Sequence, residues 1–128
     1  MPDTLKLIRF WNAIGYALVL FVIYQSLNRN PIEITVVEGN LLGHFAAYGT
    51  LMLWFSQIHA PGRARVACAT GFVLLGVCLE IVQGLTDHRT FDLFDVAANA
   101  TGVALGWLLA PPRTPNFLRK LESLFNQA

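Results

Sequence analysis

Four long apolar runs, separated by short polar segments, dominate the chain. They occupy residues 8–24, 41–58, 64–85 and 91–109. Each run is close to the ~20 residues that a helix needs to cross a ~30 Å hydrocarbon layer. None carries the polar stripe typical of a helix that faces water. The pattern therefore predicts an all-α polytopic membrane protein, a compact bundle of four transmembrane helices forming a single domain over residues 1–128.

The composition supports this class over a soluble helical bundle. Charged residues make up 13% of the chain, whereas a soluble domain has roughly 25%. The mean hydropathy is +0.51. The first run resembles a secretory signal, but no small-x-small cleavage site precedes Asn28, so we expect a retained helix. The net charge of +1 and the absence of a recognition motif give no reason to expect a nucleic-acid partner.

The Lys and Arg residues predict the orientation. Seven of the nine fall in the N-terminal segment, in the connection between the second and third runs, and in the C-terminal tail: Lys6, Arg9, Arg63, Arg65, Arg113, Arg119 and Lys120. Arg29 and Arg89 lie in the other two connections. Since cytoplasmic loops are enriched in Lys and Arg, both termini are expected to be cytoplasmic.

The tail after Pro111-Pro112 has a helical pattern of its own. Apolar residues recur at 117, 118, 121, 124 and 125, beside Arg119 and Lys120. This spacing is typical of an amphipathic helix on a membrane surface, which we expect over residues 115–126. The alternative is a disordered tail.

Several polar residues interrupt the apolar runs at one level of the expected bundle. Glu80 is the least expected, because an ionisable group within a membrane helix costs free energy and by default indicates a functional site. With the expected topology, three helices bring polar side chains to the outer third of the membrane. They are His44 and Tyr48, Glu80 and Gln83, and Asp95 and Asn99, with Arg89 in the connection between the last two pairs.

Small residues continue the same helix faces. Gly102 and Gly106 follow Asn99 at helical spacing, and Gly76 precedes Glu80 by one turn. Because small residues mark close approach between membrane helices, we expect the polar faces to converge inside the bundle. The same small-residue faces also allow a homo-oligomer.

Three motifs carry a resemblance to a known family. His44-Phe45-Ala46-Ala47-Tyr48, Glu80-Ile81-Val82-Gln83 and the segment from Arg89 to Gly102 match H-F-x-x-Y, E-x-x-Q and R-x-F-x-x-x-D-x-x-x-N-x-x-G. In this the chain resembles the VanZ-like family of small bacterial integral membrane proteins. Family members often have Asp-Lys where this chain has Asn40-Leu41, so a role for that lysine does not carry over. The resemblance implies a multi-pass protein of the bacterial inner membrane, and the family's namesake is associated with reduced susceptibility to the glycopeptide teicoplanin.

Enzyme templates match the cluster poorly. The serines Ser26, Ser56 and Ser123 lie away from it, and no spacing signature indicates a metal site or a cofactor. Purely structural roles also fit these residues. Glu80 and Arg89 could form an ion pair, Asp92 could cap a helix, and His44, Tyr48 and Asn99 could pack between helices.

Two kinds of function remain for the polar residues. The first is a site that binds a membrane lipid, a lipid-linked envelope precursor or another amphipathic envelope molecule, built from His44, Tyr48, Glu80, Gln83, Arg89, Asp95 and Asn99. Arg89 would meet a phosphate or carboxylate. The second is an enzyme that acts on such a lipid by general acid/base catalysis with Glu80, Asp95 and His44. A proton-coupled carrier is a third, less favoured hypothesis.

Overall fold

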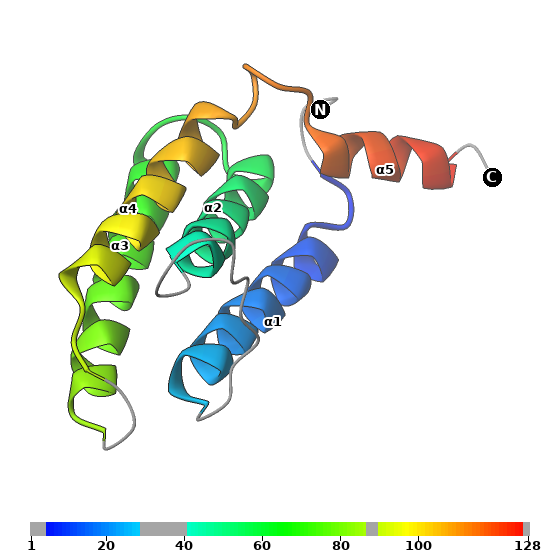
Figure 1. Ribbon diagram of the computed structural model, residues 1–128. Coiled ribbons are helices and arrows are strands. Elements are labelled where there is room, and N and C mark those ends of the chain that lie inside the picture. Colours follow the sequence, from blue (N-terminus) through cyan, green and yellow to red (C-terminus); the bar gives the residue numbers. More distant parts are fainter. Residues whose placement is uncertain (1–4, 29–40, 87–89, 127–128) are drawn as a thin grey trace.

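The computed structural model consists of α-helices joined by short connections (Figure 1). It describes residues 5–28, 41–86 and 90–126, and those ranges contain no strand. The helices are α1 (Ile8–Leu27), α2 (Leu41–Ile58), α3 (Arg63–Gly84), α4 (Leu93–Leu108) and α5 (Phe117–Asn126). The expected all-α class is therefore confirmed.

Helix boundaries differ from the expected ranges by up to three residues. α4 begins at Leu93 rather than at residue 91, because Asp92 has an extended backbone and its side chain caps the helix by accepting a 2.9 Å hydrogen bond from Phe94 N–H. α5 begins two residues later than expected. There the side chain of Asn116 accepts a hydrogen bond from Arg119 N–H, which satisfies a donor of the first turn.

Successive helices of the bundle run in alternating directions (Figure 1). This arrangement gives the bundle two distinct ends. At one end α1 and α3 finish and α2 and α4 begin, and we call it the cluster end. At the other, α1 and α3 begin, α2 and α4 finish, and α5 follows; we call it the α5 end.

The second helix forms the centre of the bundle. Its largest interface is with α4, and it also contacts α1, α3 and α5. Its side chains of Tyr48, Leu51, Met52 and Phe55 are buried, and α3 and α4 complete this core with Ala69, Phe72 and Val103.

Glycines allow the close approach of α2 and α4. A Cβ at Gly106 would lie 2.6 Å from the carbonyl oxygen of Gly49, and one at Gly102 would collide with the carbonyl oxygen of Phe45. Real Cβ atoms do not approach oxygen so closely, so only glycine permits this backbone-to-backbone contact. Gly49, on the facing side of α2, is the partner that the sequence pattern did not identify.

The outer surface of the bundle is strongly apolar. In α1 only Trp11 and Gly15 are buried, while Phe10, Leu20 and Phe21 are more than half exposed. Among the described helices, Ile8–Leu27 and Arg63–Gly84 are long and apolar enough to cross a membrane, and α4 is a shorter apolar helix. The expectation of four spanning helices depends on α2 and α4 as well, and it stays a prediction.

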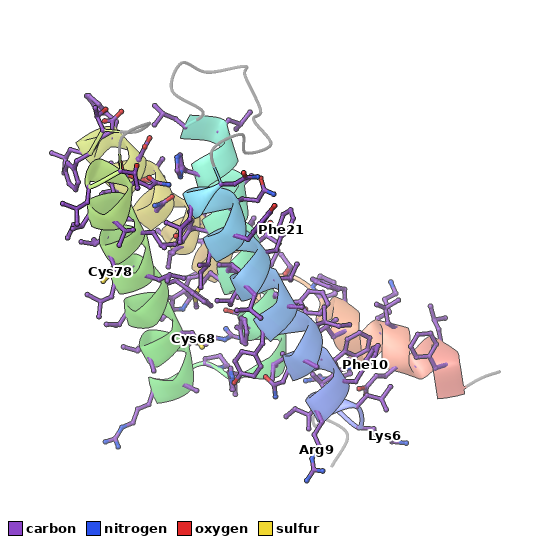
Figure 2. The ribbon with its side chains drawn as sticks, turned by 90° about the horizontal axis from the view of Figure 1, so that it is seen from below. Lys6, Arg9, Phe10, Phe21, Cys68 and Cys78 are labelled. Atoms are coloured by element: carbon purple, nitrogen blue, oxygen red, sulfur yellow. The ribbon has the colours of Figure 1, made fainter. Side chains whose placement is uncertain are left out.

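The last helix projects sideways from the α5 end, and its first turn packs against the start of α1 (Figures 1 and 2). Leu118 is fully buried with Leu5 and Trp11. Figure 2 shows Lys6, Arg9 and Phe10 at this end of α1, with Phe21 further along the helix. Cys68 and Cys78, both in α3, are free thiols.

Candidate functional site

Glu80 lies near the end of α3, and its carboxylate links α3 to the start of α4. The residue is 1% exposed. Its Oε1 accepts a 2.8 Å hydrogen bond from the backbone N–H of Asp92, which immediately precedes α4. Since the first N–H groups of a helix lack intrahelical acceptors, a carboxylate at this position is stabilised. Glu80 therefore fixes how the chain enters α4.

Asp95, in the first turn of α4, brings a second carboxyl group to Glu80. The two carboxyl groups lie close enough to interact electrostatically. Two ionised carboxylates at close range repel each other. Glu80 and Asp95 are therefore candidates for holding and exchanging a proton.

His44, in the first turn of α2, is the third member of this group. Its Nε2 lies 3.5 Å from Asp95 Oδ2, and both side chains are largely buried. Three helices therefore bring two carboxyl groups and an imidazole into contact at the cluster end.

Asn99 and Tyr48 lie one turn deeper in the bundle. Both are buried, and a Cβ placed on Gly76 would lie 2.9 Å from Asn99 Nδ2 and 3.4 Å from Tyr48 Cε2. The missing side chain at Gly76 is what leaves room for these two. Asn99 Oδ1 accepts no hydrogen bond from any residue within 5–28, 41–86 or 90–126. A buried acceptor of this kind favours a bound donor.

Gln83 makes a different contact. Its Nε2 donates a 2.5 Å hydrogen bond to the carbonyl oxygen of Ser26, in the last turn of α1. This bond joins α3 to α1, while the carboxyl pair joins α3 to α4. Arg89, the remaining predicted residue, lies outside the described residues.

The described side chains give no sign of a metal centre. Within the parts of the chain that the structure describes, no three His, Cys, Asp or Glu residues are placed to hold a metal ion. The described side chains Glu80, Asp95 and His44 can form hydrogen bonds and transfer protons, with the Asn99 oxygen as an additional acceptor.

The burial of two charged residues at the α5 end was not predicted from the sequence. Arg65 is 4% exposed and bonds three backbone carbonyls, and Glu122 is 5% exposed and bonds the start of α1. The sequence spacing of each residue indicates that it is buried. Arg63 and Arg65 are two residues apart and so lie on opposite sides of α3, while Glu122 lies one turn beyond the buried Leu118.

Comparison with known proteins is consistent with this arrangement. A family model described as VanZ/LLP1 matches residues 3–118, which confirms the resemblance seen in the three motifs. An uncharacterized protein of the fission yeast Schizosaccharomyces pombe is 34% identical over 95 residues. The match covers 72% of this chain and 58% of the yeast protein, so the chain spans about three fifths of that relative's length. No solved structure matches the chain. The family match and the two helices of membrane length together suggest a membrane protein.

Proposed function

Because the chain belongs to the VanZ/LLP1 family, we propose that it is a small membrane protein that binds an amphipathic molecule at its cluster end. In this proposal α1 to α4 all cross the bilayer and both termini are cytoplasmic. The cluster of His44, Tyr48, Glu80, Asp95 and Asn99 then opens toward the outer face, where it receives the polar head of the ligand.

The distribution of charge supports this orientation. Lys6 precedes α1 and Arg9 lies in its first turn. Arg63 begins α3, and Arg113, Arg119 and Lys120 follow α4. All of them belong to the α5 end, so the positive-inside tendency assigns that end to the cytoplasm. The 16 residues of α4 are about 24 Å long, which a slightly thinned bilayer accommodates. A reporter fused after Ala128 that is active only outside the cytoplasm would contradict the topology.

One observation carries the binding function: the convergence of Glu80, Asp95 and His44 from three helices. Buried polar groups are costly unless they form hydrogen bonds, and in this cluster Asn99 Oδ1 is a buried acceptor without a partner among the described residues. Carboxyl and amide oxygens accept hydrogen bonds, so the favoured ligand head carries hydroxyl or amine donors. Arg89 stays a sequence-based candidate for a phosphate or carboxylate of the same ligand.

The ligand that we propose is a membrane lipid or a lipid-linked envelope molecule. In a bacterial inner membrane, binding such a lipid would change the supply of envelope precursors. Altered susceptibility to a glycopeptide such as teicoplanin would be a downstream effect.

Catalysis is the second candidate function, and the contact between His44 and Asp95 favours it. An imidazole 3.5 Å from a carboxyl group that itself lies beside Glu80 resembles an acid/base arrangement. In that case the bound lipid would be converted, with Glu80 or Asp95 taking or giving the proton.

Replacing Glu80 by Gln tests both functions. The amide preserves volume but cannot share a proton, so the variant should fold and lose the amphiphile that co-purifies with the wild type, as identified by mass spectrometry. Glu122→Gln is the matched control, because it makes the same chemical change at the opposite end of the bundle; the two are compared at equal amounts of folded protein. A Glu80→Gln protein that keeps the molecule but accumulates it unconverted would favour catalysis. Retention of the ligand together with full function in a cell-envelope assay would refute both.

A further inference from the structure

A groove of about 480 Å³ opens at the α5 end of the bundle. The start of α3, the last turns of α4 and the segment after α4 form its walls, which include Arg65, Ala104, Trp107, Leu108 and Arg113. Its volume is in the range of small-molecule sites. Ala104 is nine residues beyond Asp95 on α4, or about 14 Å along the helix, so the groove is separate from the Glu80 cluster.

Arg65 is held rigidly in one wall of the groove. Its Nε donates to the carbonyl oxygen of His59 at 2.8 Å, Nη1 to that of Pro111 at 2.5 Å, and Nη2 to that of Ser56 at 2.7 Å. A guanidinium group has five N–H donors, so two remain beyond these three bonds, on a residue that is 4% exposed and lines the groove. Because the side chain is already fixed, a ligand that uses those donors does not have to order it.

The electrostatic character of the groove favours an anion. Arg113 adds a second cation at the exposed rim, and no residue that lines the groove is acidic. A helix carbonyl end repels an anion. Two carbonyls of the last turn of α4, those of Leu105 and Trp107, accept bonds from the N–H groups of Leu109 and Ala110. The carbonyls of Leu109, Ala110 and Pro111, just after α4, also accept hydrogen bonds.

We propose that this groove binds the phosphate of an anionic phospholipid from the membrane leaflet at the α5 end. Arg65 and Arg113 would contact the phosphate oxygens, since planar guanidinium groups match that geometry. Trp107 and Leu108 are both partly exposed beside the cations and would contact the glycerol and the first methylene groups. This apolar wall is what favours a lipid over a free phosphate, and basic pockets on the cytoplasmic side of membrane proteins suit such head groups.

Native mass spectrometry of the full chain in detergent tests the proposal, with dioleoyl phosphatidylglycerol and dioleoyl phosphatidylcholine as probes. The wild type should retain the anionic lipid in preference to the zwitterionic one. Arg113→Gln should weaken that retention roughly tenfold, the effect of one lost charge-assisted contact. Arg63→Gln is the matched control, because it removes an exposed charge at the same end that does not line the groove. Ala104→Phe fills the groove without changing any charge, and it should also abolish retention.

Four outcomes would overturn the proposal. Equal retention of the two lipids would show that the groove does not select a lipid with a net negative charge. An equal effect of Arg113→Gln and Arg63→Gln would show that only overall charge matters. Retention of inorganic phosphate as strong as that of the lipid, in the same measurement, would assign the groove to a soluble compound. Loss of the anionic lipid in Glu80→Gln would place it at the cluster, whereas unchanged retention there keeps the two sites distinct.

Discussion

The carboxylate of Glu122 in the last helix accepts a 2.6 Å hydrogen bond from the indole Nε1–H of Trp11 in the first helix. The same carboxylate accepts bonds from the backbone N–H groups of Lys6 at 2.8 Å and Leu7 at 2.7 Å. Leu7 is the N-cap of α1 and its side chain cannot cap the helix. Glu122, 115 positions away along the chain, caps the helix instead. Its carboxylate places a negative charge at the positive end of the helix dipole.

Glu122→Gln should destabilise the protein by about 1–3 kcal/mol, the range for hydrogen bonds to a charged group. The amide keeps one acceptor oxygen, but its NH2 group would face backbone N–H donors. Chemical denaturation in detergent micelles measures the free energy of unfolding. Lys120→Gln is the control, because it alters an exposed residue of the same helix. Equal stability of Glu122→Gln and wild type would mean that α5 is not held by this carboxylate.

The same contact should make stability depend on pH. Burial raises the pKa of the Glu122 carboxyl, but the hydrogen bonds from Leu7, Lys6 and Trp11 together bring that pKa below its ordinary value. The folded state then binds the proton less readily than the unfolded chain, whose Glu pKa is about 4.3. The stabilisation is complete above that pH and is lost as the pH falls through the folded pKa. The difference in unfolding free energy between wild type and Glu122→Gln should therefore be constant near neutrality and decrease below about pH 4. A difference that increases on acidification would contradict this account.

The contact between α2 and α4 gives a third prediction. Gly106→Ala should cost about 1–3 kcal/mol, because its Cβ would meet the backbone oxygen of Gly49 at 2.6 Å and the helices would have to separate. Gly71→Ala is the matched control, since nothing lies within 4 Å of a Cβ there. That variant should be neutral or gain up to about 1 kcal/mol from helix propensity. Equal unfolding free energies for both alanine variants would show that the interface tolerates separation.

The sequence located the interior of the bundle better than its end contacts. The periodic spacing of His44, Glu80 and Asp95 placed them on inward faces, because a polar group inside an apolar run has only the interior in which to find partners. Gly102 and Gly106 were recognisable by the same periodicity. The partner at Gly49 was not, since the register between two helices depends on packing that one helix pattern does not contain.

Local sequence patterns could not predict the long-range contacts at the α5 end. The sequence pattern assigns Arg65 to the charges of a connection, and nothing in the pattern of the expected surface helix singles out Glu122. Their roles depend on backbone groups of residues far along the chain or in other elements, such as Pro111 for Arg65 and Leu7 for Glu122. A backbone N–H or C=O group has no signature in the sequence, so such partners emerge only from the fold.

Arg65→Lys provides the last test, because it keeps the charge and changes only the geometry of the donors. The guanidinium reaches carbonyl groups at the end of α2, after α2 and after α4 at once, whereas an ammonium group on a flexible stem cannot span all three. Losing one or two of these bonds should lower the unfolding free energy by about 2–4 kcal/mol. Arg63→Lys makes the same exchange at an exposed position two residues away and should stay within about 0.5 kcal/mol of wild type. If the two lysine variants unfold at the same denaturant concentration, Arg65 acts through its charge alone and the three carbonyl contacts do not hold the α5 end together.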